Sequence, residues 1–429
     1  MNTRAGRQLL ALALVIVPGA CVAQPESSRR GTKVTPQTKI AAPTSRPAPS
    51  LPSGPIASPA KGQTTISRVS VTVAPLGEIE YNGLQLPLIS PDGKRAVSQL
   101  GTAPEWDTLI GEPGAPLAPT STFLAHSLSR DGMKLIEWVE QPQSGAMLGR
   151  MADDEGFLIE WPREDGSRWI GKTNWTTGST QWLAQGPDAS MHGVLTPAGE
   201  LLFVRRSNID NRVSLVLRSR DGTELVRSAD DGDYLAPLPY MADDLVYALR
   251  ASPRGVDVEA IRLRRNGQSP SAFGSTLARQ NLTGEASLAA AFQLLMTVAP
   301  SLPSGALAHE MPLAILSTKL RAACVFDIDS NRLVPILPQS MSATPFVGRN
   351  SQGYFASTDR QLSFVPWPFQ NQSSMSRSDA RVLASPYMLR PLCEIRNDGR
   401  TMAGHFVIMG PVKGRPDRIE LTMMVPTSD

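Results

Sequence analysis

The chain has 429 residues, of which 41% are hydrophobic and 6% aromatic, so it can build a packed core and is not a wholly disordered protein. Its 42 basic and 39 acidic residues leave a net charge of +3, which gives no support to nucleic-acid binding. Three cysteines are too few for a disulfide scaffold or a cysteine zinc cluster.

Residues 1–23 have the pattern of a signal peptide. A basic start precedes an apolar run from Leu9 to Val17, which is far shorter than the ~20 residues that span a bilayer. Two processing routes stay open. Gly19-Ala20-Cys21 resembles the end of a bacterial lipobox, which predicts lipidation of Cys21, whereas ordinary cleavage after Ala23 would remove that cysteine. We expect export to the periplasm or cell envelope, with membrane attachment only through such a lipid.

Residues 24–62 are predicted to form a disordered linker. The segment carries eight prolines and hardly any large apolar side chains, so it cannot bury enough surface to offset the entropy of ordering. The domain therefore extends over residues 63–429.

A turn followed by an apolar strand recurs along this domain. Asp tolerates the left-handed conformation and Gly supplies a positive φ, so each copy has the chemistry of a hairpin turn. The clearest copies end at Gly93, Gly132, Gly199 and Gly399. Looser copies lie near Asp244, Gly305 and Gly353.

The turn Ser90-Pro91-Asp92-Gly93-Lys94-Arg95 resembles the repeat of TolB-like β-propellers, a WD-repeat-like family of exported bacterial proteins. This resemblance implies an all-β fold made of a single propeller. Most of the turns recur near the ~40–50-residue period of a blade, which predicts seven blades, with six or eight as alternatives. Leu158 to Trp161 repeats the pattern of Leu135 to Trp138, so Gly156 is a further candidate for the start of a blade.

Two segments fall outside the repeat. Thr283 to Val298 carries apolar residues at helical spacing and predicts a helical insertion. The last blade offers only three strands, which end with Arg418 to Val425, while the strand Ile66 to Val73 is surplus to the first blade. We therefore expect these two strands to pair and close the ring.

Motifs for chemistry are scarce. No Gly-x-Ser-x-Gly elbow and no phosphate loop occur, and we assign no catalytic residue, metal or cofactor. The four histidines, which each lie near a repeat turn, are interpreted as unrelated surface or core residues: His126, His192, His309 and His405. The calcium-like segments Asp327–Asn331 and Asp230–Asp233 are predicted to be turns, and Cys324 and Cys393 to be free, buried thiols.

Five tryptophans lie between residues 138 and 182. Trp169 and Trp175 share strand parity, and a turn brings the chain back toward Trp182. If exposed, these three residues form a stacking platform for sugar rings or a hydrophobic anchor for a partner. The alternative is that they pack between blades.

The sequence thus predicts an exported, monomeric, non-catalytic propeller that binds a protein or polysaccharide of the envelope. The alternative is a carbohydrate-active enzyme of the lyase or glycosidase type, working at the propeller channel. Neither alternative involves nucleic acid.

Overall fold

The computed structural model describes part of the chain, all of it within the unit Thr65–Asp429. Described are residues 71–80, 87–101, 105–285 (except 119, 130, 131, 197, 243 and 268), 291, 294, 295, 313–338, 346–350, 353–357, 362–366, 381–384, 390–397 and 400–426 (except 413). The predicted signal peptide, Cys21 and the proline-rich linker lie outside the described residues.

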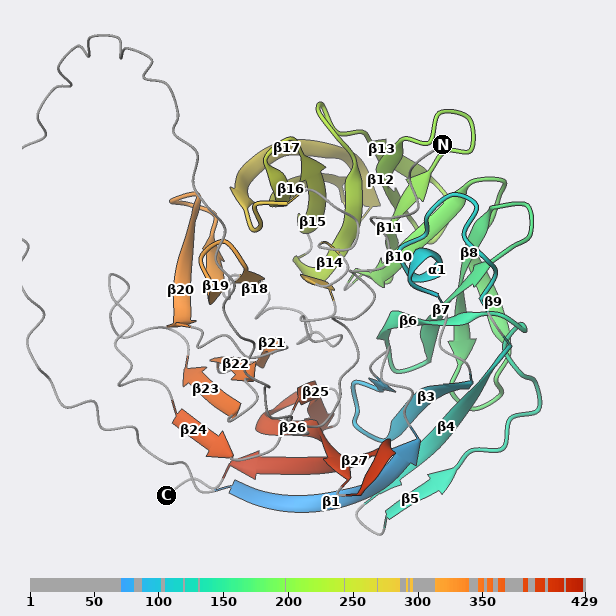
Figure 1. Cartoon of the computed structure of the whole chain (residues 1–429), viewed down its shortest axis with the longest axis vertical. Helices are drawn as coiled ribbons and strands as arrows, with labels where there is room; N and C mark the ends of the chain where they lie inside the picture. Colours follow the sequence, from blue (N-terminus) through green and yellow to red (C-terminus); the bar gives the residue numbers. More distant parts are fainter. Residues whose placement is uncertain are drawn as a thin grey trace, which may run out of the picture. The chain divides into compact units, whose positions relative to one another are not determined.

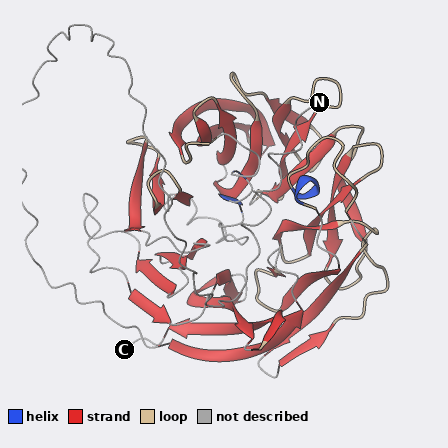
Figure 2. Ribbon diagram, in the orientation of Figure 1, coloured by secondary structure: helices blue, strands red, loops and turns tan. Residues whose placement is uncertain are grey.

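Antiparallel strands that follow one another in the chain make up almost all of the described structure (Figure 2). Their bounds are β1 Val71–Glu80, β2 Leu88–Ile89, β3 Arg95–Gly101, β4 Ser121–Ser129, β5 Gly132–Leu135, β6 Met147–Ala152, β7 Gly156–Pro162, β8 Arg168–Asn174, β9 Thr180–Ala184, β10 Ala189–Leu195, β11 Leu201–Arg206, β12 Val213–Arg218, β13 Glu224–Arg227, β14 Tyr234–Ala242, β15 Leu245–Ser252, β16 Gly255–Asn266, β17 Ser269–Asn281, β18 Leu313–Ser317, β19 Ala322–Asp327, β20 Arg332–Pro338, β21 Phe346–Asn350, β22 Gly353–Ser357, β23 Leu362–Pro366, β24 Arg381–Ala384, β25 Arg390–Asn397, β26 Arg400–Val412 and β27 Arg415–Pro426. A short helix, α1, spans Trp106–Leu109. The all-β prediction is confirmed.

The strands pair in groups of three or four. Six groups are β2–β5, β6–β9, β10–β13, β14–β17, β18–β20 and β21–β24, and the last is β25–β27 together with β1. The second and third groups share one sheet, which a single parallel bridge between Ala189 and Arg168 connects. This grouping covers the described residues only, and the number of blades stays a prediction of the sequence.

Neighbouring groups contact one another through their first strands. Strand β2 lies against β6, β6 against β10, β10 against β14, β18 against β21 and β21 against β25. Buried side chains of β14–β16 and β18–β19 share one hydrophobic cluster, which joins those two groups. Strand β25 contacts β2 and β1 contacts β5, so the circuit closes (Figure 1). Sheets that pack face to face in such a circuit form a β-propeller.

The closing strand pair is present as expected. Strand β1 runs antiparallel to β27, and the register places Val73 opposite Met424 and Ile79 opposite Ile419. The bounds of β1 differ from the predicted Ile66 to Val73, because the strand continues to Glu80. A register shift between Pro75 and Gly77 lets it continue, since it accommodates a proline that would otherwise interrupt the ladder.

The repeat turns are confirmed in part. Gly93 and Gly199, with φ of 69° and 76°, lie in turns between the first and second strands of their groups. Gly132 instead connects β4 to β5, the third and fourth strands, so it is not equivalent to the others. In the next group, the turn between the first two strands, β6 and β7, ends at Gly156, which the sequence indicated as a further candidate for the start of a blade. Gly305 and Gly399 lie outside the described residues.

The predicted helical insertion falls mostly outside the described residues. Within it, Ala291, Leu294 and Leu295 are helical and at most 2% exposed, and they join the hydrophobic cluster between β14–β16 and β18–β19. The described part of the insertion therefore contributes to the core.

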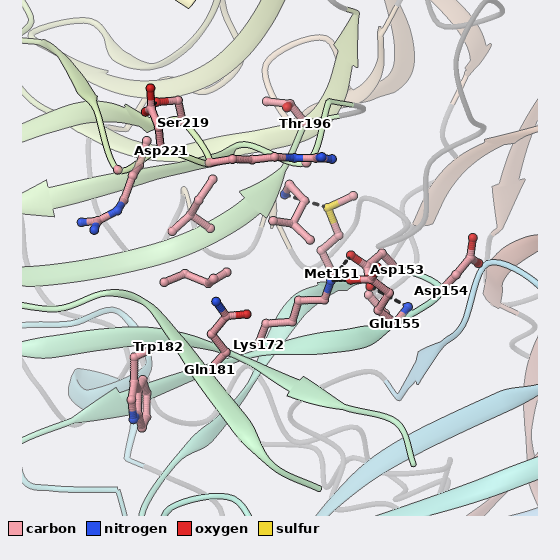
Figure 3. A pocket seen from close by; sticks show the side chains of 18 of the residues that line it. Met151, Asp153, Asp154, Glu155, Lys172, Gln181, Trp182, Thr196, Ser219 and Asp221 are labelled. Carbon is pink, nitrogen blue, oxygen red and sulfur yellow. Dashed lines mark hydrogen bonds and ion pairs between the residues drawn. The ribbon is translucent and has the colours of Figure 1, made fainter. Parts of the chain in front are cut away.

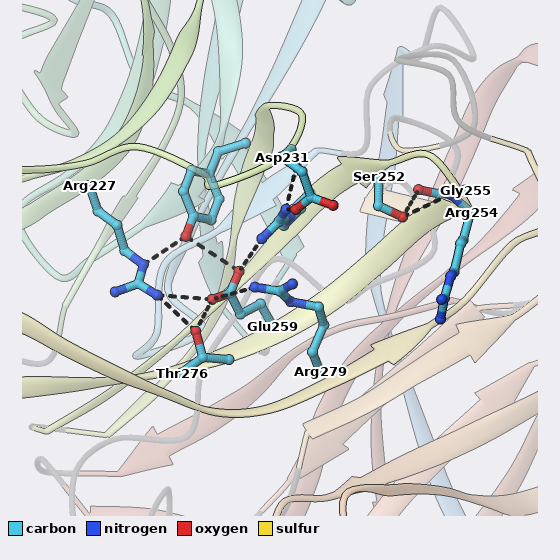
Figure 4. A network of polar contacts seen from close by, with 10 residues as sticks. Arg227, Asp231, Ser252, Arg254, Gly255, Glu259, Thr276 and Arg279 are labelled. Carbon is cyan, nitrogen blue, oxygen red and sulfur yellow. Dashed lines mark hydrogen bonds and ion pairs between the residues drawn. The ribbon is translucent and has the colours of Figure 1, made fainter.

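A buried ionic network ties β13 to the group β14–β17 (Figure 4). The Glu259 side chain is fully buried and accepts hydrogen bonds from Arg227 at 3.1 Å and from the Thr276 hydroxyl. Arg279 Nη2 and Arg250 Nη1 lie 3.5 and 3.8 Å from the same carboxylate. Although burial works to raise it, the pKa of Glu259 is lowered by the Thr276 hydrogen bond and the nearby arginines.

Candidate functional site

A cleft of about 850 Å³ lies between the groups β6–β9 and β10–β13 (Figure 3). The hairpin turns after β6, β10 and β12 line it, together with side chains of β8 and β9. The turns after β6 and β10 connect the first two strands of their groups and end near Gly156 and Gly199, two positions that the repeat pattern indicated. The turn after β12 connects the third and fourth strands. Its polar lining includes Asp153, Glu155, Lys172, Gln181, Ser219 and Arg220.

One wall of the cleft is an acidic turn held by a lysine. Lys172 Nζ lies 2.6 Å from Asp153 and 2.7 Å from Glu155. Although burial works to lower it, hydrogen bonds to these two carboxylates raise the pKa of Lys172. The Lys172 hydrogen bond and charge lower the pKa of Glu155, and the charge of Arg220 adds to this effect. Arg220 belongs to the neighbouring group, so the two walls interact electrostatically.

The other wall is the turn from Ser219 to Gly222. Asp221 shapes it by accepting hydrogen bonds from the Ser219 hydroxyl at 2.5 Å and from the Thr223 backbone N–H at 2.9 Å. The Arg220 side chain lies over Gly199, where an added Cβ would meet its Nη2 atom at 2.4 Å. Gly199 thus gives Arg220 room to face the cleft.

Several side chains of the cleft are exposed and uncommitted. Asp154, Gln181 and Arg220 make no side-chain hydrogen bond or ion pair with the rest of the described structure. The cleft therefore presents one free carboxylate, one free amide and one free guanidinium to an incoming ligand.

A cluster of three tryptophans lies on the face of β7–β9 that looks toward the first group. Trp161 and Trp169 are directly opposed in the ladder, with ring centroids 5.6 Å apart. Trp182 stacks on Trp161 at 5.5 Å and meets Trp169 edge-on at 5.7 Å. The Arg163 guanidinium lies 4.3 Å from the centre of the Trp169 ring. Gly171 makes room for Trp182, since a Cβ there would lie 2.9 Å from the indole.

Two of the three predicted platform residues meet in this cluster. Trp169 and Trp182 are half-buried, and Trp161, which the prediction omitted, lies between them. Trp175 does not join them: it is 1% exposed, it donates from Nε1 to the Asp153 carbonyl at 2.8 Å, and its ring lies 5.0 Å from Phe157. Trp161 and Trp182 also pack against the hydrophobic cluster between the first two groups. Their role as a ligand platform stays a prediction.

The two histidines whose side chains are described lie in different groups. Burial lowers the pKa of His126, on β4, and its Nδ1 atom is buried without a hydrogen-bond partner. His192, on β10, has a φ of 57°, and its backbone N–H donates to Glu160 at 2.6 Å. In the described part of the chain, no three His, Cys, Asp or Glu side chains are grouped to hold a metal ion.

The calcium-like segments lie at turns, as predicted. Asp327 accepts backbone hydrogen bonds from Asp329 and Ser330 in the turn between β19 and β20. Gly232, with a φ of 84°, lies between β13 and β14. Cys324 is a fully buried free thiol, and burial raises its pKa to about 12. The side chain of Cys393 lies outside the described residues.

Comparison with solved structures finds chains that are similar over most of this one. The circuit of antiparallel groups is a β-propeller. One similar solved structure is the WD40 domain of Toxoplasma gondii coronin, with a TM-score of 0.47 and 8% identity, covering 85% of this chain and 88% of the other. Another is a luciferin-regenerating enzyme, with a TM-score of 0.35 and 9% identity, covering 83% and 95%. No family model and no curated protein matches the sequence.

The described helices include none that is long and apolar enough to cross a bilayer.

The buried His192 of this propeller makes stability depend on pH. Burial lowers the pKa of His192 from 6.5 to about 4, so between these values the unfolded chain binds a proton that the folded chain does not. The stabilisation is complete above pH 6.5 and is lost as the pH falls toward 4. Relative to His192→Asn, whose side chain also tolerates a positive φ, the wild type should lose about 2 kcal/mol of unfolding free energy between pH 7 and pH 5. Urea unfolding of both proteins at each pH measures this difference. The prediction is contradicted if the wild type and His192→Asn lose the same unfolding free energy between pH 7 and pH 5.

Proposed function

We propose that the protein is an exported, non-catalytic β-propeller that binds a protein of the cell envelope through the cleft between β6–β9 and β10–β13. The signal-peptide pattern of residues 1–23 and the resemblance of the Ser90–Arg95 turn to TolB-like repeats support the location. The observation that carries the proposal is the set of uncommitted charged side chains in the cleft, which the hairpin turns hold on a rigid scaffold.

The charges favour a polypeptide as the partner. Asp154 and Arg220 offer opposite charges, and Gln181 between the walls can both donate and accept hydrogen bonds. A polypeptide carries acidic, basic and amide groups together, so it can satisfy both signs of charge. The tryptophan rings are less suited to stacking on a sugar, since Trp161, Trp169 and Trp182 contact one another and Arg163 covers one face of Trp169.

Site-specific photo-crosslinking in cells tests this proposal. A photo-reactive residue at the exposed Gln181 should yield a discrete adduct with an envelope protein, whereas the same residue at Ile209, which is 96% exposed and outside the cleft, should not. The charge reversal Arg220→Glu should reduce the adduct about tenfold or more, because it removes the free cation of the cleft.

The remaining outcomes decide against the proposal. Equal adducts at Gln181 and Ile209, or an adduct insensitive to Arg220→Glu, would show that the cleft does not select the partner. An adduct that digests with glycosidases rather than proteases would replace the protein partner with an envelope polymer.

A further inference from the structure

A second group of charged side chains lies apart from the cleft, where β6, β7, β8, β10 and β11 come together. The side chains of Arg168 and Glu160 are 5% and 7% exposed, and Arg168 Nη1 lies 3.2 Å from Glu160 Oε2. The second oxygen, Oε1, accepts the backbone N–H of His192 at 2.6 Å. Both oxygens of this carboxylate are therefore occupied.

Two further arginines share this region. The Arg206 guanidinium donates to the Gly111 carbonyl. Burial lowers the pKa of Arg206 most, and the nearby charge of Arg168 lowers it further, so the two cations are neighbours. Arg150 lies on β6, and its Nη2 donates to the Leu295 carbonyl at 2.8 Å. Three guanidinium groups thus share this region with one buried carboxylate, and His192 adds no charge at neutral pH because its pKa is about 4.

Arg150 makes no ion pair with the described residues and contacts the Leu295 carbonyl instead. Its Nη1 atom is buried and has no hydrogen-bond partner among the described residues, and its side chain as a whole is half-buried. Burial lowers the pKa of Arg150 to about 10, and Glu160 works in the opposite direction, so the group stays charged at neutral pH. A buried guanidinium nitrogen without an acceptor is costly, and an anion beside it would remove that cost.

The other two guanidinium groups are held in place from outside the cluster. Arg168 Nη2 donates to the Thr108 carbonyl at 2.5 Å, and Arg206 reaches Gly111, so both bind the segment around α1. These neutral carbonyls fix the positions of the two cations, and Glu160 offsets the charge of Arg168. Three arginines with one buried carboxylate leave the cluster with a net positive charge.

From this geometry we infer an oxyanion-binding site at Arg150 Nη1, for a carboxylate or phosphoryl group, within a cluster that has more arginines than buried carboxylates. The planar guanidinium matches the oxygens of either group. The site does not depend on the proposed function, since none of its residues lines the cleft. The oxyanion can belong to a free small molecule or to an acidic polypeptide.

Titration with two probes tests the site and separates these sources. Inorganic phosphate and a hexaglutamate peptide are titrated into the purified protein at constant ionic strength, with chloride as the reference, and binding is followed by calorimetry and by the shift in Tm. Arg150→Gln should weaken binding of the preferred probe at least tenfold. The matched control Arg212→Gln, at an exposed position, should leave binding unchanged.

A second variant should change the affinity for the oxyanion in the opposite direction. Glu160→Gln keeps an acceptor for the His192 N–H but removes the only buried negative charge of the cluster, so it should tighten binding of the oxyanion several-fold. If Arg150→Gln does not fold, Arg150→Lys, which keeps the charge without the planar fork, should bind more weakly than the wild type. The inference is overturned if neither probe binds more tightly than chloride, or if Arg150→Gln (or, in its place, Arg150→Lys) and the wild type bind equally well.

Discussion

Replacing Glu259 with glutamine is expected to lower the free energy of unfolding by about 3–5 kcal/mol, because removing one member of a buried ion cluster leaves its partners uncompensated. The carboxylate is fully buried, and the guanidinium groups of Arg227, Arg279 and Arg250 lie 3.1, 3.5 and 3.8 Å away (Figure 4). Without its charge these three cations repel one another, and the buried Arg250 keeps only Asp231 as a counter-ion among the described residues. Denaturant unfolding of the variant and the wild type measures the loss.

A surface ion pair supplies the matched control. Glu224 contacts Arg205 at 2.7 Å and Arg218 at 3.1 Å, but its side chain is 23% exposed. Because solvent screens such a pair, Glu224→Gln should cost about 1 kcal/mol or less. Similar losses for the two variants would show that burial of the Glu259 network contributes nothing beyond an ordinary surface contact.

Removing the closing strand should have the second large effect. A chain that begins at Tyr81 lacks β1, and with it the buried side chains of Leu76 and Ile79 and the ladder to β27. Each buried side chain contributes ~1.5–3 kcal/mol and each net ladder hydrogen bond ~0.5–1.5 kcal/mol, so we expect a loss of more than about 5 kcal/mol. The exposed edge of β27 should also promote aggregation. Thermal unfolding and light scattering measure both effects against a chain that begins at Lys61.

The exposed ion pairs of β1 should contribute much less to stability than its strand pairing does. Arg415 lies 3.0 Å from Glu78, and Arg418 lies 3.5 Å from Glu80, at exposed positions. The double variant Glu78→Gln, Glu80→Gln keeps the ladder and should lower the Tm only slightly. An equal Tm for the chains that begin at Tyr81 and Lys61 would show that β1 does not stabilise the ring.

The fold class could be predicted from the sequence because turn chemistry is local. The Ser90–Gly93 turn is fixed by its own residues: Gly93 donates its N–H to the Ser90 carbonyl at 2.8 Å, and Asp92 accepts a hydrogen bond from the Ser90 hydroxyl. The same local pattern does not say which two strands a turn connects. The sequence therefore predicts that Gly132 is equivalent to Gly93, although it joins the third and fourth strands of its group.

The functional residues were harder to predict because they depend on register. Strand parity placed Trp175 with Trp169, but β8 ends at Asn174, so parity does not extend to Trp175. Trp161 joins Trp169 only because the two are paired across β7 and β8, which no local pattern shows. The Arg150 cluster draws on five strands, and the positive φ of His192 that brings its N–H to Glu160 leaves no mark in the sequence.

The pairing of β1 with β27 also sets the order of events when the protein is made. Arg415 and Glu78, which meet in this pair, are 337 residues apart in the chain. A ribosome must therefore synthesise every other group of strands before the partner of β1 exists, and β1 waits unpaired throughout. Long-range closure of this kind carries a large loop entropy and slows folding. A chaperone that shields β1 during synthesis would shorten the time for which this edge is open to other chains.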